Sequence, residues 1–180
     1  GAPTTDVTLT DVEVPVDHVV GEEAGWNNGW SMLVGPGLDV EKLEVAALAL
    51  GIATAAADDA WAYSQERTQF GRSIASFQAV RHTLAEVRSK LYAARLMTFH
   101  AAWLSANGMP CRAETSMAKM FVCELCKEAV LSCQTVLGAY GYVNALDMER
   151  YVRDILLMPI IGGSANIQKN NIANAFRLPR

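Results

Sequence analysis

Few side chains in this sequence combine the types and the spacing that chemistry needs, and two cysteines are the first candidates. Cys123 and Cys126 are separated by two residues, the gap used by zinc knuckles and by redox-active pairs. No second pair has this gap, and neither Gly nor Pro lies between the two cysteines to provide a turn. We therefore interpret the pair as small buried side chains on one helix face. The four cysteines together favour a reducing, cytoplasmic location.

Other self-contained catalytic motifs are absent from the sequence. A di-iron centre in a helical bundle uses Glu-x-x-His pairs, but the residues three positions before the three histidines are Pro15, Ala79 and Met97. His-Glu-x-x-His, the Gly-x-Ser-x-Gly of hydrolases and the phosphate-binding loop are missing as well. We predict no metal site.

Two glutamates near the start of a predicted helix are the remaining candidates. Glu41 and Glu44 each have apolar residues three or four positions away, so helical periodicity favours neither. The helix dipole also favours acidic residues at a helix start. Residue types alone therefore leave open whether either glutamate does chemistry.

These candidates lie on elements that the sequence predicts to be long helices. The first covers residues 39–66 and is rich in Ala and Leu. The third covers Arg112–Leu137 and ends at Gly138. In the second, which Asn107-Gly108 ends, apolar residues step by three or four positions, as in packed antiparallel helices. These residues are Phe77, Val80, Leu84, Val87, Leu91 and Ala94.

Two shorter helices complete the predicted architecture, at residues 147–157 and 164–177. Ser164 follows two glycines and is a suitable N-cap for the second of them. Three long helices and a broken fourth predict an all-α fold, an up-and-down four-helix bundle.

The N-terminal residues follow a different pattern. Val7, Leu9, Val12 and Val14 alternate in part with polar residues and lead to Pro15, which predicts one β-strand. One strand cannot form a sheet. The strand must therefore pair outside this chain or be the stub of an upstream β-domain, and the chain is expected to be a fragment of a longer protein.

Composition excludes several classes of protein. The 180 residues suit one domain, and a hydrophobic share of 51% rules out disorder. A net charge of −4 without blocks of like charge gives no support for nucleic-acid or anionic-membrane binding. The longest uncharged run, residues 129–146, contains polar residues and glycines that a bilayer tolerates poorly. Because the apolar share exceeds the usual one, we expect subunit contacts, and thus an oligomer.

Three stretches together resemble the acyl-CoA dehydrogenases. They are Glu-Arg-Thr-Gln-Phe-Gly at 66–71, Leu-Gly-Ala-Tyr-Gly-Tyr at 137–142 and Gly-Gly-Ser-Ala-Asn-Ile-Gln at 162–168. Their order and spacing extend the resemblance over essentially the whole chain. It implies that residues 1–24 are the end of that family's middle β-domain with a linker. It also implies that residues 25–180 are its C-terminal helical bundle.

The resemblance implies a flavoenzyme that oxidises the Cα–Cβ bond of an acyl-CoA thioester. In that family FAD binds between domains and between subunits, the bundle forms the core of a tetramer, and an electron-transfer flavoprotein or a similar acceptor takes the electrons. We therefore expect FAD, an acyl-CoA substrate and self-association to a dimer or tetramer. The fragment alone is not expected to turn over.

The resemblance also implies a position for the catalytic base. In many members a glutamate stands at the position that is Gly162 here, and glycine cannot do acid–base work. In the isovaleryl-CoA and long-chain branches the base lies on the first long helix of the domain, in a sequence similar to residues 38–42, where Glu41 matches it. Crotonobetainyl-CoA reductase-like members combine a Gly-Gly-Ser turn with an Asp-x-Glu helix, as this chain does. Glu41 is therefore the expected base.

Further residues take their expected roles from the same motifs. Arg67 matches an arginine that reaches the FAD pyrophosphate of a neighbouring subunit, a contact suited to the planar guanidinium. The other expected FAD contacts are Gln69, Phe70, Gln134, Thr135, Gly138, Ser164 and Asn166. The expected substrate contacts are Asp39, Lys42, Ile161 and Gly163.

Two departures from the family pattern keep alternatives open. Thr135 stands where glutamine is usual, and Ala139 replaces a glycine that lets backbone approach the cofactor. One alternative is a non-catalytic oligomerisation or partner subunit of a heteromeric acyl-CoA dehydrogenase. Another is an enoyl-CoA reductase of the crotonobetainyl-CoA type, which uses the same residues with a different redox partner.

Overall fold

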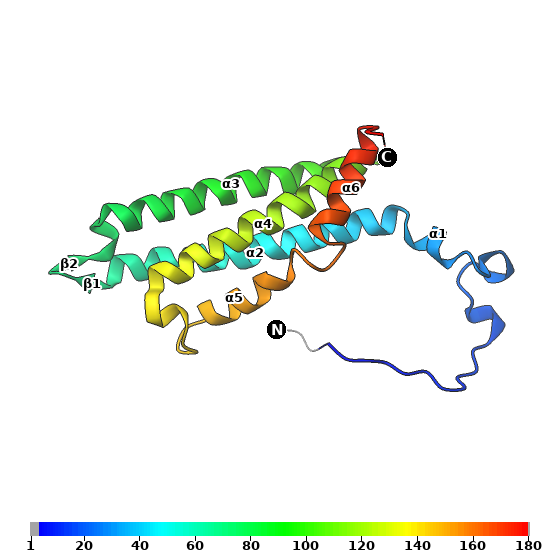
Figure 1. Cartoon of the computed structure of the whole chain (residues 1–180), viewed down its shortest axis with the longest axis horizontal. Coiled ribbons are helices and arrows are strands. Elements are labelled where there is room, and N and C mark those ends of the chain that lie inside the picture. Colours follow the sequence, from blue (N-terminus) through cyan, green and yellow to red (C-terminus); the bar gives the residue numbers. More distant parts are fainter. Residues whose placement is uncertain (1–3, 180) are drawn as a thin grey trace.

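Three long helices lie side by side in the computed structural model, which describes residues 4–179, the side chain of Pro36 excepted. They are α2 (Pro36–Glu66), α3 (Gln78–Ala106) and α4 (Arg112–Leu137), and they alternate in direction (Figure 1). The shorter α5 (Met148–Leu157) packs along α2 and α4, and α6 (Ala165–Ala175) packs on α4. The predicted all-α, up-and-down bundle is confirmed.

The helix ends follow from residues that cannot continue a helix. Proline suits the first turn because its missing N–H has no partner there, and α2 begins at Pro36, three residues before the predicted start. Gly108 after α3 has φ +65°, and Gly138 after α4 has φ +59°, a region that favours glycine. α3 and α4 therefore end where the sequence predicts.

Small residues fill the contact between α2 and α4. The buried alanines of α2 are Ala46, Ala49, Ala53, Ala56, Ala57 and Ala60. On α4 the interpretation of the cysteine pair is confirmed, because Cys123 and Cys126 are fully buried and unpaired. Burial raises the pKa of Cys123 to about 11 and that of Cys126 to about 12, so neither thiol is reactive. Side chains this small let the two helix backbones approach closely.

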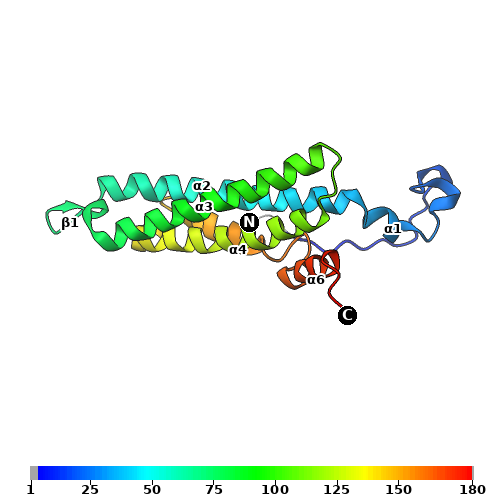
Figure 2. The same ribbon diagram turned by 90° about the horizontal axis from the view of Figure 1, so that it is seen from above.

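The strand expected near the N-terminus is not formed, and this detail of the prediction is corrected. Between residues 4 and 15 the chain has no regular secondary structure, and its alternating apolar side chains are exposed. A strand needs a partner for its ladder, and the described residues offer none to this segment. After it come two short 3-10 helices, η1 (Val16–His18) and η2 (Glu22–Gly25), and α1 (Gly29–Leu33), which project from the bundle (Figures 1 and 2). The boundary predicted at residue 24 stays a prediction.

The bundle presents two different ends. At the hairpin end, β1 (Thr68–Gln69) and β2 (Arg72–Ser73) form an antiparallel pair, η3 (Ile74–Ser76) leads into α3, and η4 (Gly138–Gly141) follows α4. At the opposite end, which we call the turn end, the starts of α2 and α4 meet residues 159–164 before α6 (Figure 2). Within residues 4–179 no helix has both the length and the apolarity to cross a membrane.

Candidate functional site

The start of α2 is fixed by two polar residues that the sequence assigned to the substrate. Asp39 Oδ1 accepts hydrogen bonds from Lys42 Nζ at 2.8 Å and from Thr115 Oγ1 of α4 at 3.2 Å. The Lys42 side chain is only 6% exposed, so this ion pair is largely withdrawn from water. Both side chains are thus engaged within the protein, and their contact with substrate stays a prediction.

The carboxylate of Glu41 is left free by this arrangement. Its side chain is exposed and makes no hydrogen bond or ion pair within the described residues. Glu41 lies one helical turn before Val45, on the same face of α2. Glu44, in contrast, lines a shallow hollow with Leu48 and Gly51. Both glutamates are exposed and unpaired within the described residues, and they differ in that only Glu44 lines this hollow.

Val45, one helical turn after Glu41, contacts the turn that precedes α6. Gly162 and Gly163 have φ of +62° and +85°, and a Cβ built on Gly162 would lie 3.1 Å from Val45 Cγ2. The first glycine thus packs directly against α2, one turn from Glu41. Its conformation and its crowding both disfavour a larger residue at this position.

Two buried side chains, one on α4 and one on α6, bind the carbonyls of the same turn. Lys119 of α4 is fully buried and donates to the carbonyl of Pro159 at 3.0 Å and to that of Gly163 at 2.7 Å. Gln168 of α6 is 1% exposed and donates to the carbonyls of Gly162 at 3.0 Å and Gly163 at 3.1 Å. Burial is the main cause that lowers the pKa of Lys119.

The N-terminus of α6 opens beside this turn. Ser164 occupies the predicted N-cap position, but its hydroxyl makes no capping hydrogen bond. Ser164 and Asn166 are exposed, and Ile161 is half-buried. Backbone N–H groups in the first turn of a helix favour anions. Two of the predicted cofactor contacts therefore lie at the turn end.

The hairpin end holds the arginine and the aromatic residue predicted to contact FAD. Phe70 and Gly71 join β1 to β2, and both have positive φ, 53° and 77°. Phe70 is 91% exposed, and its ring makes an edge contact with Phe77. Arg67 is exposed, forms no ion pair within the described residues and places Cζ 5.9 Å from the centroid of the Tyr140 ring. Gln69 is exposed beside them.

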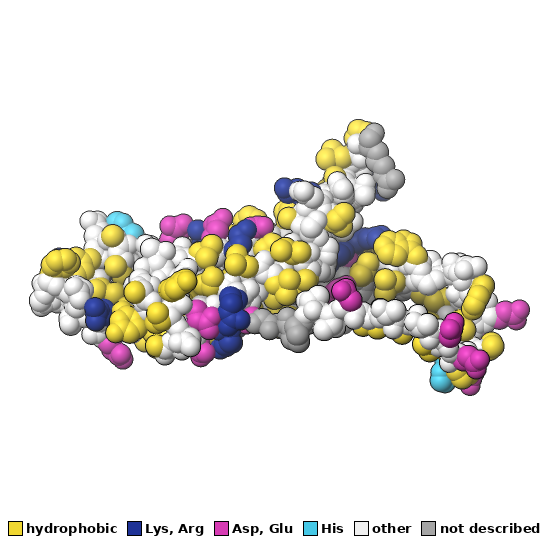
Figure 3. Space-filling model, turned by 60° about the horizontal axis from the view of Figure 1, so that its bottom comes forward, with side chains coloured by type: hydrophobic (Ala, Val, Ile, Leu, Met, Phe, Trp, Pro, Cys, Tyr) yellow, Lys and Arg dark blue, Asp and Glu magenta, His cyan; other side chains and the backbone are white. Residues whose placement is uncertain are grey.

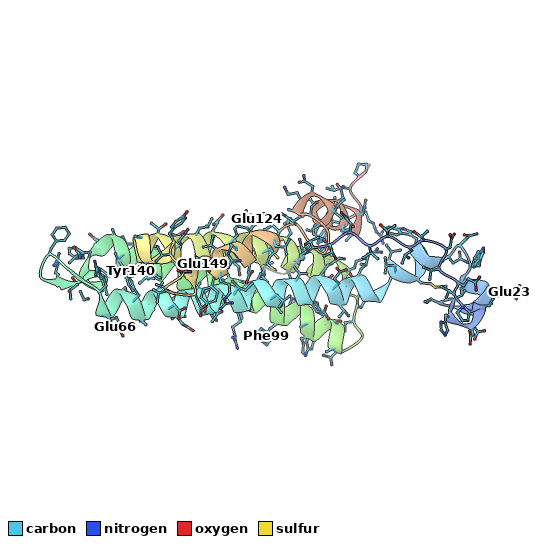
Figure 4. The ribbon with its side chains drawn as sticks, turned by 90° about the horizontal axis from the view of Figure 1, so that it is seen from below. Glu23, Glu66, Phe99, Glu124, Tyr140 and Glu149 are labelled. Carbon is cyan, nitrogen blue, oxygen red and sulfur yellow. The ribbon has the colours of Figure 1, made fainter. Side chains whose placement is uncertain are left out.

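The motif at residues 137–142 and the end of α4 before it lie at the same end, where two polar side chains bind backbone carbonyls of the same region. Gln134 Nε2 lies 3.4 Å from the carbonyl of Gly141, and Thr135 Oγ1 donates to the carbonyl of Leu131 at 2.9 Å. Gly138 turns the chain out of α4. Figure 4 places Tyr140 toward the hairpin end, as it does Glu66 at the end of α2.

The predicted site residues therefore form two groups at opposite ends of the bundle. Glu41 and Arg67 lie 26 residues apart along almost the full length of α2, which corresponds to about 39 Å at 1.5 Å per residue. No single ligand of ordinary size can touch both groups in one chain. The cofactor and substrate roles of all these residues stay predictions.

Sequence reasoning missed two members of the turn end, Lys119 and Gln168. The signal for the lysine was present, because Lys119 lies on the apolar stripe of α4, one turn after Thr115 and one turn before Cys123. A lysine on a stripe that faces the core needs acceptors inside the protein. Among the described residues, no group of three or more His, Cys, Asp or Glu side chains is arranged to hold a metal ion.

Comparison with known proteins gives consistent matches. A sequence profile described as "Acyl-CoA dehydrogenase, C-terminal domain" matches residues 27–176. The chain is 37% identical over 170 residues to the CarC subunit of the caffeyl-CoA reductase-Etf complex of Acetobacterium woodii, covering 94% of this chain and 44% of that protein. It is 38% identical over 174 residues to the 3-(aryl)acrylate reductase of Clostridium sporogenes, covering 97% and 45%.

A solved structure extends the likeness to three dimensions. Butyryl-CoA dehydrogenase from Megasphaera elsdenii matches with a TM-score of 0.76 and 32% identity, over 77% of this chain and 36% of that one. The chain spans less than half the length of the curated relatives named above. Since the profile covers most of the bundle and the fold agrees, this chain belongs to the acyl-CoA dehydrogenase family, as its C-terminal helical domain.

Proposed function

We propose that this chain is the C-terminal domain of an FAD-dependent acyl-CoA dehydrogenase in which Glu41 is the catalytic base. One observation carries the proposal: Glu41 is an unpaired carboxylate one turn from Val45, the residue against which the Gly162 turn packs. Of the neighbouring carboxylates, Asp39 is engaged by Lys42 and Thr115, and Glu44 lies on the hollow beside Leu48.

The chemistry assigned to Glu41 is removal of the proton α to a thioester. The carboxylate takes that proton and becomes a carboxylic acid, the β-hydrogen leaves with both bonding electrons, and the Cα–Cβ bond becomes double. Bound FAD supplies the acceptor for the hydride. A carboxylate is a stronger base when water is excluded. The parts of the protein outside this chain would cover Glu41, since the relatives are more than twice as long.

The hairpin end fits the chemistry of FAD. Phe70 is a large aromatic residue that is nearly fully exposed at a turn whose φ favours Gly or Asn, so its edge contact with Phe77 comes at a conformational cost. Arg67 offers an unpaired guanidinium suited to a pyrophosphate. The ring and the phosphates of the cofactor would meet these two side chains.

The distance between the two groups requires a second copy of the chain. Because about 39 Å separates Glu41 from Arg67, the hairpin end would serve the flavin of a neighbouring subunit. α3 carries an exposed apolar stripe at helical spacing that such a contact would cover, formed by Tyr92, Leu96, Phe99 and Trp103. Figure 4 shows Phe99 on the outer face of the bundle, and Figure 3 shows further apolar side chains exposed along another face. We infer a dimer or tetramer.

The proposed electron acceptor is an electron-transfer flavoprotein. This partner is suggested by the relative from Acetobacterium woodii, whose name places it in a complex with Etf. The printed names of two relatives, which refer to caffeyl-CoA and butyryl-CoA, also suggest CoA thioesters as the substrate class. The cytoplasmic location inferred from the cysteines stays part of this proposal.

The test is a matched pair of variants in the full-length protein. Glu41→Gln keeps the size and hydrogen-bonding capacity of the side chain but cannot accept the proton, so reduction of the bound flavin by acyl-CoA should be abolished. Glu44→Gln makes the same change one turn away on the hollow and should leave that rate unchanged. Equal rates in both variants would remove Glu41 from the mechanism. A full-length protein that purifies colourless would favour a non-catalytic partner subunit.

A second candidate function is the reverse reaction, reduction of an enoyl-CoA. The two relatives named above are both reductases, and they match this chain at 37% and 38% identity. The same residues would act in reverse, with Glu41 giving a proton to the α-carbon while hydride reaches the β-carbon. Steady-state rates in both directions, with a reductant and enoyl-CoA or with an acceptor and acyl-CoA, decide between them.

A further inference from the structure

The turn end contains a lysine that the proposed chemistry does not use. Lys119 is fully buried on α4, and within the described residues it makes no ion pair with a carboxylate. Its ammonium group is bound instead by two backbone carbonyls, those of Pro159 and Gly163, at 3.0 and 2.7 Å. A buried charge held only by neutral acceptors is expensive to keep.

Stability alone does not explain this residue. A methionine would avoid the cost of desolvating a charge, but it would leave the carbonyl of Pro159 without this donor. Burial indeed lowers the pKa of Lys119, which shows that the site disfavours the charged form. The role of the lysine therefore lies with the backbone atoms that it binds.

Those atoms belong to the turn that packs against the helix of the proposed base. The segment bound by Lys119 includes Gly162 and Gly163, both with positive φ, and a Cβ on the first would lie 3.1 Å from Val45 Cγ2, closer than ordinary van der Waals contact. Gln168 donates to the same two glycine carbonyls. Four hydrogen bonds from two buried side chains thus fix three carbonyls of a glycine-rich segment, which would otherwise have many conformations.

The same face of α4 also fixes the start of α2. Thr115 lies one turn before Lys119 and donates to Asp39, two residues before Glu41. Residues four apart on a helix are close neighbours, about 5–6 Å between Cβ atoms. One turn of α4 therefore binds both the helix that carries the proposed base and the turn opposite it.

We propose that Lys119 is a positioning residue, which holds the Gly162–Gly163 turn at a fixed separation from Glu41 through the carbonyls of Pro159 and Gly163. This role rests on the proposed function of Glu41. Lys119 touches neither substrate nor cofactor, and its effect is on the geometry of the slot in which the α-proton is removed. A displacement of about 1 Å in such a site can lower a rate about 100-fold.

The test compares three variants of the full-length protein by the rate of flavin reduction per bound flavin. Lys119→Met removes the donors and keeps most of the length of the side chain. Gln168→Met removes the second pair of hydrogen bonds to the turn, and Ser116→Ala is the control. Ser116 is also fully buried on α4, but its hydroxyl has no hydrogen-bond partner in the described part of the chain. Lys119→Met should lower kcat about 10- to 100-fold with KM changed by less than about 3-fold, and Ser116→Ala should change neither.

Hydrogen exchange gives a second measurement that does not depend on turnover. In Lys119→Met the amides of residues 160–168 should exchange faster, while those at the start of α2 keep their wild-type rates. If Lys119→Met fails to fold, Gln168→Met decides the question, because it loosens the same carbonyls and should lower kcat per flavin in the same direction.

The outcomes separate the two proposals. If Glu41→Gln is inactive while both methionine variants keep the kcat per flavin of the wild type, the positioning role is wrong and the base stands. If both methionine variants lower kcat while Glu41→Gln remains active, the turn matters and the base is misassigned. A wild-type protein with no activity toward any CoA thioester overturns the proposed function and the positioning role together.

Discussion

Gly162 offers the sharpest test of how the turn end is built. Replacing it with alanine adds one methyl group at a residue with φ +62°. A residue with a Cβ is disfavoured in this left-handed region by about 1–2 kcal/mol. The new Cβ would also lie 3.1 Å from Val45 Cγ2, and overpacking of this kind typically costs about 1–3 kcal/mol. We expect Gly162→Ala to lower the free energy of unfolding by about 2–5 kcal/mol.

Gly108 provides a matched control for the conformational part of this cost. Its φ is +65°, almost the same as that of Gly162, but a Cβ built on it would meet no atom within 4 Å. Gly108→Ala should therefore lose only the left-handed term, about 1–2 kcal/mol. The difference between the two variants isolates the contact with Val45, and it should be about 1–3 kcal/mol.

The assay is thermal unfolding followed by far-UV circular dichroism, with wild type and both variants at one protein concentration. For a chain of this length each kcal/mol shifts Tm by about 2–4 °C, so the difference is measurable. Equal shifts for the two variants would contradict the close packing of Gly162 on α2. The same crowding predicts that Gly162→Glu, made in the Glu41→Gln background, does not restore flavin reduction, although it returns a carboxylate to the turn.

Three further predictions follow from individual sites. Phe70→Asn should leave the free energy of unfolding within about 1 kcal/mol of the wild type, because the tolerance of Asn for positive φ offsets the lost edge contact with Phe77, and it should lower the flavin content of the purified full-length protein; an unchanged flavin content would contradict the assigned role. Lys42→Met should lower the free energy of unfolding by about 3 kcal/mol, because it leaves a poorly hydrated carboxylate unpaired. Lys127→Met, which breaks a more exposed pair, should lower it by less than about 1 kcal/mol in the same urea titration. Burial raises the pKa of Cys126 from 9.0 to about 12, so stability is lost as the pH rises above the unfolded value; between about pH 8 and about pH 10 the wild type should lose about 1.4 kcal/mol more than Cys126→Ala.

The helices could be predicted from the sequence because their signals are local. The bounds of α4 were predicted to the residue, and α3 ended at Asn107-Gly108 as expected, since glycine and the helix period act over a few positions. The N-terminal strand failed for the opposite reason. Its alternating pattern is correct for a half-buried strand, but a strand exists only with a ladder partner, and a local pattern carries no information on whether a partner is present.

Residues of the candidate site could be predicted only where they belong to a recognisable sequence motif. Glu41 and Arg67 could be proposed because their neighbours in sequence are informative. Lys119 and Gln168 were missed because both donate to backbone carbonyls, and every residue type has a backbone carbonyl. The carbonyls that Lys119 binds are 40 and 44 residues away in sequence, and those that Gln168 binds are 6 and 5 residues away. A polar residue inside an apolar stripe remains the one usable signal for such contacts.

The structure gives a physical reason for placing the proposed base on α2. A glutamate in the turn would need a Cβ at Gly162, and there the backbone is left-handed and Val45 already fills the space. A carboxylate on α2 needs neither a change of backbone nor a gap in the core, because Glu41 is on the surface of a rigid helix whose start is bound to α4. With the proposed base on α2, the turn needs to supply only its shape. Two glycines, held by their carbonyls, then provide that shape.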